Sequence, residues 1–289
     1  MTTPRTDTAS DAPPPAFDIY DQGLQADVAT LIDRRRVLQV MGLAGFAAFI
    51  AACAPGSSPT ASAAATSSSV AASDAAAACA PVIPEETAGP FPGDGTNGPD
   101  VLTESGVVRS DITTSFGASS GTAEGVPLTI RLLVQDEGSA CEPLAGAAVY
   151  AWHCDREGRY SLYSQGVEDE NYLRGVQAAG DDGIVTFQSI FPAAYQGRWP
   201  HVHFEVYPSL AAAADAGNKI ATSQIALPKA TCDEVYATAG YEQSVSNMSR
   251  ISLETDGVFG DDGGAHQLGT VSGTVANGLT VELAVPVNA

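Results

Sequence analysis

Basic side chains are few in this sequence. Its 289 residues include 13 lysine and arginine residues against 34 aspartate and glutamate residues, which gives a formal net charge of −21. Contacts to a nucleic-acid backbone require a basic surface that can neutralise phosphates. The charge balance therefore excludes nucleic acid as a partner, and it fits a soluble protein that works outside the cytoplasm.

Cysteine is also scarce, and its spacing excludes one common kind of metal site. The sequence has five cysteines and no C-x-x-C motif, so a zinc site built from cysteine pairs is not expected. After Cys53 come Cys79, Cys141, Cys154 and Cys232. An even number in an exported domain predicts two disulfides. Their pairing is left open, and a local bridge between Cys141 and Cys154 is one possibility.

No apolar run is long enough for a mature transmembrane helix. The run Val37–Ala52 follows Arg34–Arg36 and spans about 16 residues, whereas a membrane helix needs about 20. A basic flank, an apolar core and small terminal residues are typical of an export signal, and the paired arginines resemble a twin-arginine signal. The ending Ile-Ala-Ala-Cys resembles a lipobox. We therefore expect residues 1–53 to be a lipoprotein signal, with Cys53 acylated and the protein anchored at the cell surface; an ordinary signal-peptide cysteine is the alternative.

The remaining chain divides into a tether and a globular domain. Residues 54–78 consist mainly of Ala, Ser, Thr and Pro without a hydrophobic period, which predicts a flexible tether. Residues 79–289 contain short runs rich in Val, Ile, Thr and aromatic residues, each bounded by Gly, Pro, Asp or Asn. Many short strands without intervening helices predict an all-β fold, an antiparallel β-sandwich.

The predicted strands are Leu128–Val134, Ala147–His153, Ile184–Ile190, His201–Tyr207, Ile220–Leu227 and Leu279–Val285. Two further stretches have a helical pattern, Ala211–Ala216 and Lys229–Ala239.

Two histidines two residues apart stand at the start of one predicted strand. Residues i and i+2 of a strand point to the same face, so His201 and His203 present two imidazoles side by side, which suits a metal ion. Tyr195 and Arg198 precede them in a turn rich in Gly and Pro, and Tyr160 lies 35 residues before Tyr195. A solvent-facing histidine pair is the alternative interpretation.

The motifs around these residues, taken together, resemble the intradiol ring-cleavage dioxygenases. These are the non-haem iron(III) enzymes that include catechol 1,2- and protocatechuate 3,4-dioxygenases. The stretches that carry the resemblance are Gly158–Ser161, Leu173–Gln177, Gly183–Tyr195 and Gly197–Phe204, and the segments Pro84–Phe91 and Arg109–Ile112 are similar to the secreted branch of that family. The resemblance extends over about residues 79–260.

The resemblance implies a ferric ion, Fe(III), as the cofactor. Its implied ligands are two tyrosinates and two imidazoles, from Tyr160, Tyr195, His201 and His203. Arg198, Gln224 and Tyr195 have implied catalytic roles, and Gln224 matches less closely because its spacing from His203 is longer. The implied reaction uses O2 to cleave a small catechol-type diol to a cis,cis-muconate-type diacid, as in the catabolism of aromatic compounds.

This ligand set is also reasonable from elementary chemistry. The phenol of tyrosine has a pKa of about 10, and a trivalent cation favours its charged form. Hard anionic oxygen ligands in turn suit Fe(III) over softer metals. Tyr163 is an alternative to Tyr160, but Tyr160 fits the G-x-Y-S pattern. We expect Arg174 to brace a loop by hydrogen bonds, and we expect Asp256 to be a solvated loop residue.

Two other functions use the same residues differently. A cupin also has H-x-H on a strand, but it needs a glutamate four or five residues further on and a later histidine. Here Glu205 follows His203 by two residues, and His266 lies in a loop rich in Gly and Asp. A zinc hydrolase would use the histidines without the tyrosines. The alternative from another class is a surface-anchored lipoprotein that binds a ligand on a β-sandwich.

Overall fold

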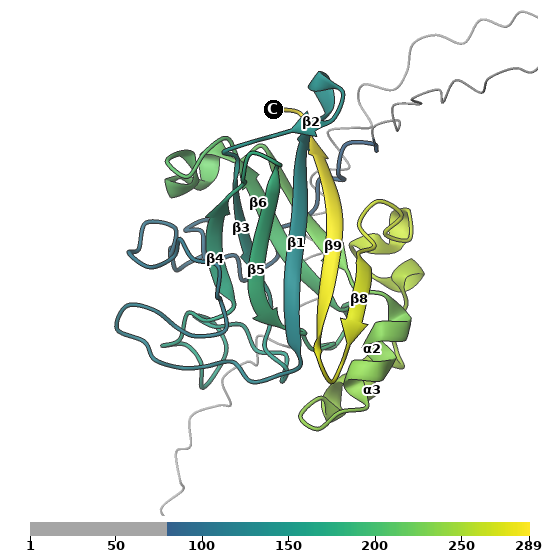
Figure 1. Ribbon diagram of the computed structural model, residues 1–289. Helices are drawn as coiled ribbons and strands as arrows, with labels where there is room; N and C mark the ends of the chain where they lie inside the picture. The colour runs from purple at the N-terminus through teal and green to yellow at the C-terminus, as the bar shows by residue number, and fades with distance from the viewer. Residues whose placement is uncertain (1–79) are drawn as a thin grey trace, which may run out of the picture.

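The computed structural model describes residues 80–289 as two β-sheets packed face to face (Figure 1). The predicted signal of residues 1–53 and the predicted tether of residues 54–78 lie outside the described residues, as do Cys53 and Cys79. Within residues 80–289, no helix has the length and apolar character needed to cross a membrane.

The sheets contain four and five strands. The first sheet has the order β4 (Arg174–Ala178), β3 (Ala148–Trp152), β6 (His201–Tyr207) and β7 (Ala221–Ala226). The second sheet contains β1 (Pro127–Asp136), β2 (Glu142–Pro143), β5 (Ile184–Ile190), β8 (Thr270–Thr274) and β9 (Gly278–Val287).

Strand pairing confirms the all-β sandwich and adds one difference from the expected pattern. Every pair in the first sheet is antiparallel. In the second sheet, β1 pairs antiparallel with β2 and β5 but parallel with β9, over nine residue pairs from Leu128–Leu279 to Asp136–Val287. A parallel neighbour is possible because a long stretch of chain, which includes the four strands of the other sheet, separates β1 from β9.

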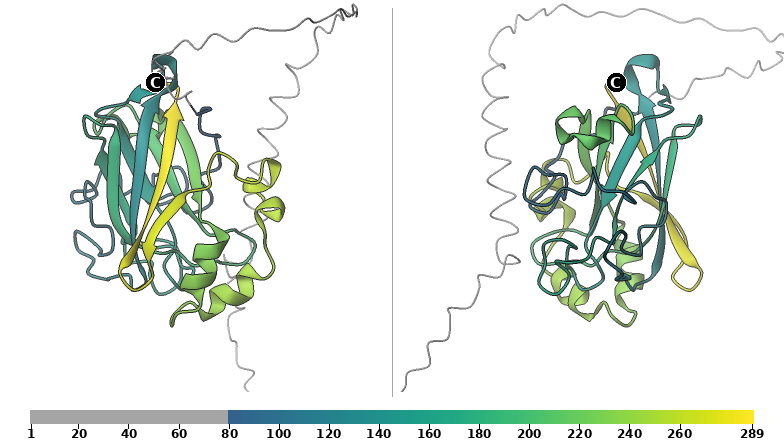
Figure 2. Two further views of the ribbon diagram at one scale, coloured as in Figure 1. Left: turned by 45° about the vertical axis from the view of Figure 1, so that its right-hand side comes forward. Right: turned by 90° about the vertical axis from the view of Figure 1, so that its left-hand side faces the viewer.

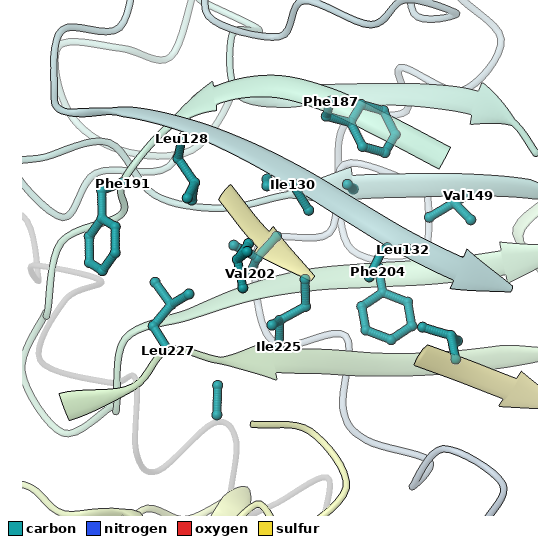
Figure 3. Close-up of a cluster of buried hydrophobic side chains, with 14 of the residues drawn as sticks. Leu128, Ile130, Leu132, Val149, Phe187, Phe191, Val202, Phe204, Ile225 and Leu227 are labelled. Carbon is teal, nitrogen blue, oxygen red and sulfur yellow. The ribbon is translucent and has the colours of Figure 1, made fainter. Parts of the chain in front are cut away.

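The hydrophobic core lies between the two sheets (Figure 3). Along β1, Leu128, Ile130 and Leu132 are at most 1% exposed, whereas the residues between them are less buried. This alternation follows from the period of two in a strand, which turns every second side chain inward. Opposite them, Val202 and Phe204 of β6 belong to the same cluster.

Strand β6 is buried on its outer face as well. Because its even-numbered residues face the core, its odd-numbered residues His201, His203, Glu205 and Tyr207 point away from it. A second cluster of buried side chains covers that outer face, including Phe91, Tyr160 and Trp152. The predicted metal-binding residues therefore lie under loops on this face, and only Tyr195 among them is less than fully buried.

The two α-helices of the described residues lie together at one end of the sandwich (Figures 1 and 2). The α-helices are α2 (Lys229–Tyr236), which agrees with the predicted helical stretch, and α3 (Glu242–Met248). Five 3-10 turns complete the described elements: η2 (Glu137–Ser139), η3 (Ala212–Ala214), η4 (Ala216–Asn218), η5 (Leu253–Thr255) and η6 (Phe259–Asp261).

The prediction of two disulfides is wrong. Cys154 and Cys232 are buried, free thiols, so the local bridge between Cys141 and Cys154 does not form. At most one disulfide is then possible among the four cysteines, and the described part of the chain contributes only Cys141 to it. Burial in apolar surroundings stabilises both thiols as small hydrophobic side chains.

Candidate metal centre

The four side chains predicted to bind a metal meet at one point. His201 Nε2 lies 3.0 Å from His203 Nε2, 3.3 Å from Tyr195 Oη and 3.5 Å from Tyr160 Oη. The two phenol oxygens lie 3.5 Å apart. Ligands bound at about 2 Å from one ion are separated by about 3 Å, so these spacings fit a shared ion. That the four residues bind a metal stays a prediction.

The backbone explains how distant parts of the sequence meet here. His201 and His203 stand on the outer face of β6, Tyr195 lies in the turn after β5, and Tyr160 lies in the loop after β3. Gly158 has φ +85°, and a Cβ atom at this position would lie 3.2 Å from Tyr195 Cβ. A glycine therefore lets the Tyr160 loop approach the Tyr195 turn closely.

Both histidines are held neutral. His201 Nδ1 is 2.5 Å from the carbonyl oxygen of Trp199, to which it donates, and this leaves the Nε2 lone pair facing the phenols. Burial and the charge of Arg198 lower the pKa of His201 to about 3. Burial and His201 hold the pKa of His203 well below its usual value. Neutral imidazoles are the form that binds metals.

The tyrosines are suited to a cation in a different way. Tyr160 is 1% exposed, and burial together with the neighbouring Tyr195 raises its pKa well above the usual value. Tyr195 is half-buried, so the cluster is reachable from its side. Two phenol oxygens directed at two imidazole nitrogens form a site that a highly charged cation would complete, because the cation favours phenolate.

The donor set distinguishes between kinds of metal site. Residues 80–289 contain no group of three or more His, Cys, Asp or Glu side chains that could hold a metal ion. A metal at this point would therefore need the tyrosine oxygens, and such hard anionic ligands suit Fe(III). The cupin alternative fails here because both oxygens of Glu205 are engaged, by Lys219 and by Tyr207, and His266 is exposed in its loop.

An aromatic stack supports His203 from one side. The ring of Trp152 lies parallel to His203, with centroids 4.8 Å apart and 5° between the planes, and Tyr150 stacks on the other face of Trp152 at 4.8 Å. His203 Nδ1 is buried and has no hydrogen-bond partner among the described residues. The stacked rings therefore support His203 from that side, and its Nδ1 makes no hydrogen bond within residues 80–289.

Arg198 is buried beside the cluster and is paired with Asp256. Its side chain is 1% exposed, its Nε donates to Asp256 Oδ2 at 3.0 Å, and its Nη2 donates to Gln224 Oε1 at 2.6 Å. Gln224 is held in turn by its Nε2, which donates to the carbonyl oxygen of Thr87 at 2.9 Å. The structure thus places both predicted catalytic side chains together, next to the histidines.

The expectation that Asp256 is a solvated loop residue is wrong. Asp256 is 3% exposed, and its Oδ2 also accepts from the Trp199 N–H at 2.6 Å, while its Oδ1 accepts from the N–H groups of Val258 and Phe259. The ring of Phe259 lies 5.9 Å from the Arg198 guanidinium and 6.4 Å from His201. Neither residue stands in a motif, so only their tertiary position reveals them.

The residues rejected as ligands lie elsewhere. Tyr163 Oη donates to the carbonyl oxygen of Asn97 and accepts from the Gly93 N–H, each at 2.9 Å. His153 is buried and bonds through its ring nitrogens to the Cys154 carbonyl and the Ser189 hydroxyl, and burial lowers its pKa to about 4. Both side chains serve the fold around the cluster.

Comparisons with known proteins agree with this geometry. Residues 97–216 match a family model described as "Dioxygenase", a span that includes Arg198 and all four residues of the cluster. The chain is 37% identical to a chlorocatechol 1,2-dioxygenase of Rhodococcus opacus over 54 residues, 19% of the chain and 21% of that protein. It is 33% identical to a hydroxyquinol 1,2-dioxygenase of Rhizobium sp. over 75 residues, 26% of the chain and 24% of that protein. The chain thus matches about a fifth to a quarter of the length of these curated relatives.

A solved structure extends the likeness to the whole sandwich. An intradiol ring-cleavage dioxygenase from Tetranychus urticae superposes with a TM-score of 0.58 and 26% identity, covering 73% of this chain and 95% of that protein. In its two-sheet fold, in the family match across the cluster and in this superposition, the chain is similar to the intradiol ring-cleavage dioxygenases.

Proposed function

We propose that this protein is an Fe(III)-dependent intradiol dioxygenase that cleaves a catechol-type ring with O2 to give a cis,cis-muconate-type diacid. The observation that carries the proposal is the convergence of two phenol oxygens and two imidazole nitrogens within 3.0–3.5 Å. The match to the dioxygenase family model supports the reaction class, and the relatives named for chlorocatechol and hydroxyquinol support a small aromatic diol as the substrate.

The residues present fit a ferric ion. Tyr160, Tyr195, His201 and His203 would hold it. When bound, the ion would make a catechol reactive towards O2 and would require no organic cofactor. Two neutral imidazoles and two phenols that ionise in its presence supply two negative charges inside a buried site. This is a better match to a trivalent than to a divalent ion.

Tyr195 is placed to move a proton. A catechol has two hydroxyl protons to lose, and both must be accepted inside the site. Tyr195 is the more exposed of the two tyrosines, and its Oη lies 3.3 Å from His201 Nε2. The phenolate oxygen of Tyr195 would therefore be the protein group that accepts one of these protons.

Arg198 supplies fixed positive charge. Negative charge develops on the ring carbon as the diol reacts, and a preoriented cation in a dry site stabilises it without reorganisation. Asp256 and Gln224 hold the guanidinium by two hydrogen bonds, so its orientation does not depend on the substrate. Phe259, which is fully buried, excludes water from the side of Arg198 and His201.

The test is to load the purified protein with Fe(III) and measure oxygen uptake over a panel of catechol, chlorocatechol, hydroxyquinol and protocatechuate, with product spectra. We expect a red-brown protein, one O2 consumed per ring, and absorption of a muconate-type product. A zinc-loaded sample serves as the control. A colourless protein that consumes no oxygen with any diol would favour the zinc-site or ligand-binding alternatives.

Export and anchoring belong to the same proposal. Acylation of Cys53 would place the domain at the cell surface, where free aromatic diols from outside the cell are accessible. The supporting observations are the basic flank, the apolar run and the Ile-Ala-Ala-Cys ending in the sequence.

A further inference from the structure

Arg174 is a buried arginine whose described partners are all uncharged. It opens β4, pairs with Trp152 in the sheet, and is 1% exposed. None of the ion pairs within residues 80–289 includes it. Its guanidinium instead donates five hydrogen bonds, to three carbonyl oxygens and two hydroxyl oxygens. Burying a charge is unfavourable unless hydrogen bonds compensate it, so the placement calls for a reason.

We propose that Arg174 is a positioning residue for the metal centre, which sets the place of the Tyr160 phenol and of the segment 91–93 that packs on it. The inference rests on the proposed function, because it concerns how the chain arranges the donors of that site. It assigns Arg174 no contact with the substrate or the ion.

Two of the hydrogen bonds fix the backbone next to Tyr160. Arg174 Nε donates to Ser161 Oγ at 3.1 Å, and Nη2 donates to the Ser161 carbonyl at 3.0 Å. Ser161 directly follows Tyr160, and its hydroxyl donates onward to the Tyr172 carbonyl at 2.7 Å. The peptide that carries the phenol is therefore held to β4 at two atoms.

Two further bonds hold the segment that covers Tyr160. Arg174 donates to the carbonyl oxygens of Phe91 at 3.0 Å and Pro92 at 2.8 Å. The Phe91 ring then packs on Tyr160, with centroids 5.1 Å apart. Gly93 has φ +67°, and a Cβ there would lie 2.7 Å from Arg174 Nη1. The chain thus passes against the guanidinium so closely that a side chain at position 93 would clash with it.

The fifth bond reaches the support of His203. Arg174 Nη1 donates to Tyr150 Oη at 3.1 Å, and Tyr150 stacks on Trp152, which stacks on His203. One side chain therefore contacts the supports of two predicted ligands, Tyr160 in the loop after β3 and His203 on β6. Only a guanidinium offers five donors in one plane; a lysine offers three from a single point and cannot satisfy these acceptors together.

The experiment compares Arg174→Lys with Arg109→Lys in the full chain. Arg109 is a matched control because its side chain also donates to backbone carbonyls, those of Thr114, Asn171 and Arg174, but it bonds to no residue next to Tyr160. Two quantities are measured: the affinity for Ga(III), a redox-inert analogue, from the ultraviolet difference absorption of tyrosinate, and the position of the Fe(III) charge-transfer band.

We expect R174K to bind Ga(III) at least tenfold more weakly than wild type and to shift or weaken the visible band. We expect R109K to stay within twofold of wild type with an unchanged band. Ser161→Ala removes the Nε–Oγ contact and the hydroxyl's bond to the Tyr172 carbonyl but leaves the other four bonds of Arg174 in place. It should shift the band in the same direction by less, and it provides the test if R174K does not fold.

Three outcomes overturn the inference. The first is a Ga(III) affinity and a visible band in R174K that equal those of wild type. The second is an equal loss of Ga(III) affinity in R174K and R109K, because a general structural role would then explain both. An unfolded R174K together with an unshifted S161A band would have the same meaning. A wild-type protein that binds neither Fe(III) nor Ga(III) would refute the proposed function itself and this inference with it.

Discussion

The buried pair of Arg198 and Asp256 gives the sharpest prediction, through the substitution Asp256→Asn. The two carboxylate oxygens accept four N–H groups, two on each oxygen: Arg198 and Trp199 on Oδ2, Val258 and Phe259 on Oδ1. An asparagine has the same shape but only one acceptor oxygen. Whichever way the amide is turned, its NH2 group faces two donors, and the charge of Arg198 loses its described partner.

The magnitude follows from the burial. Removing one partner of a buried ion pair costs about 3–5 kcal/mol, whereas an exposed pair contributes about 0.2–1 kcal/mol. With a urea slope of at most about 3 kcal/mol per molar, the unfolding midpoint should fall by at least about 1 M. Trp152 and Trp199 are the two tryptophans of the sequence and both are buried, so tryptophan fluorescence follows the transition.

Asp233→Asn is the matched control. Asp233 pairs with Lys229 at 2.7 Å on the surface of α2, where the two side chains are 54% and 66% exposed. The same substitution there should move the midpoint by a few tenths of a molar at most. If D256N unfolded at the same urea concentration as D233N, the buried pair would contribute no more than a surface pair, and the argument that Asp256 holds Arg198 would be wrong.

The pH dependence gives a second check on the same residue. Burial acts to raise the pKa of Asp256, but the charge of Arg198 and the N–H groups of Trp199 and Val258 outweigh it and hold the pKa below its usual range. A depressed pKa stabilises the folded state above the unfolded value of about 3.9, and the contribution is lost as the pH falls through the folded value. The stability difference between wild type and D256N should therefore be constant from about pH 5 to 8 and narrow below about pH 4.

Three further predictions concern other parts of the chain. Tyr195→Phe should bleach or shift the visible band of the Fe(III) protein, whereas Tyr163→Phe should leave it nearly unchanged; the opposite pattern in absorption spectra would mean that the wrong tyrosine had been assigned. Burial above all raises the pKa of Glu86 to about 7, so its contribution to the free energy of unfolding is full below about pH 4.5 and falls by about 3 kcal/mol as the pH rises through 7. Glu86→Gln should remove that loss. The prediction would be contradicted if wild type and E86Q had equal melting temperatures at pH 5 and again at pH 8. Cys53→Ala should abolish incorporation of labelled palmitate in a lipoprotein-processing host, and label retained in C53A would exclude acylation at Cys53.

Strand prediction succeeded where side chains follow a simple period. β5 and β6 begin and end at the predicted residues, and β1 extends the predicted run by one residue at its start and two at its end. β4 was missed because Arg174-Gly175 interrupts any apolar pattern. β8 was missed because its residues are small and polar, and it lies exposed beside β9. Neither strand has the alternation of apolar and polar residues from which a strand is predicted.

The candidate site also contains residues that a local sequence pattern reveals and one that it does not. His201 and His203 were found because a strand places alternate residues on one face, and the tyrosines were found through the motifs around them. Asp256 lies 58 residues after Arg198 in a loop of ordinary polar composition, and its role depends on a contact that no sequence period encodes.

The burial of polar residues on the outer face of β6 explains why His201 and His203 were found from the sequence and why the role of Asp256 was missed. A strand with one face in water would show polar residues at alternate positions because they are solvated, and the pattern His-x-His-x-Glu matches that expectation equally well. In the structure these side chains are at most 2% exposed. Glu205 is met by Lys219 and Tyr207, and His201 Nδ1 donates to the Trp199 carbonyl. Arg174 donates to carbonyl oxygens of segments 91–93 and 160–161, which lie over this face. Burial on this face holds the pKa values of His201 and His203 low and covers the Tyr160 phenol. The alternating polar pattern of the strand alone does not specify that burial.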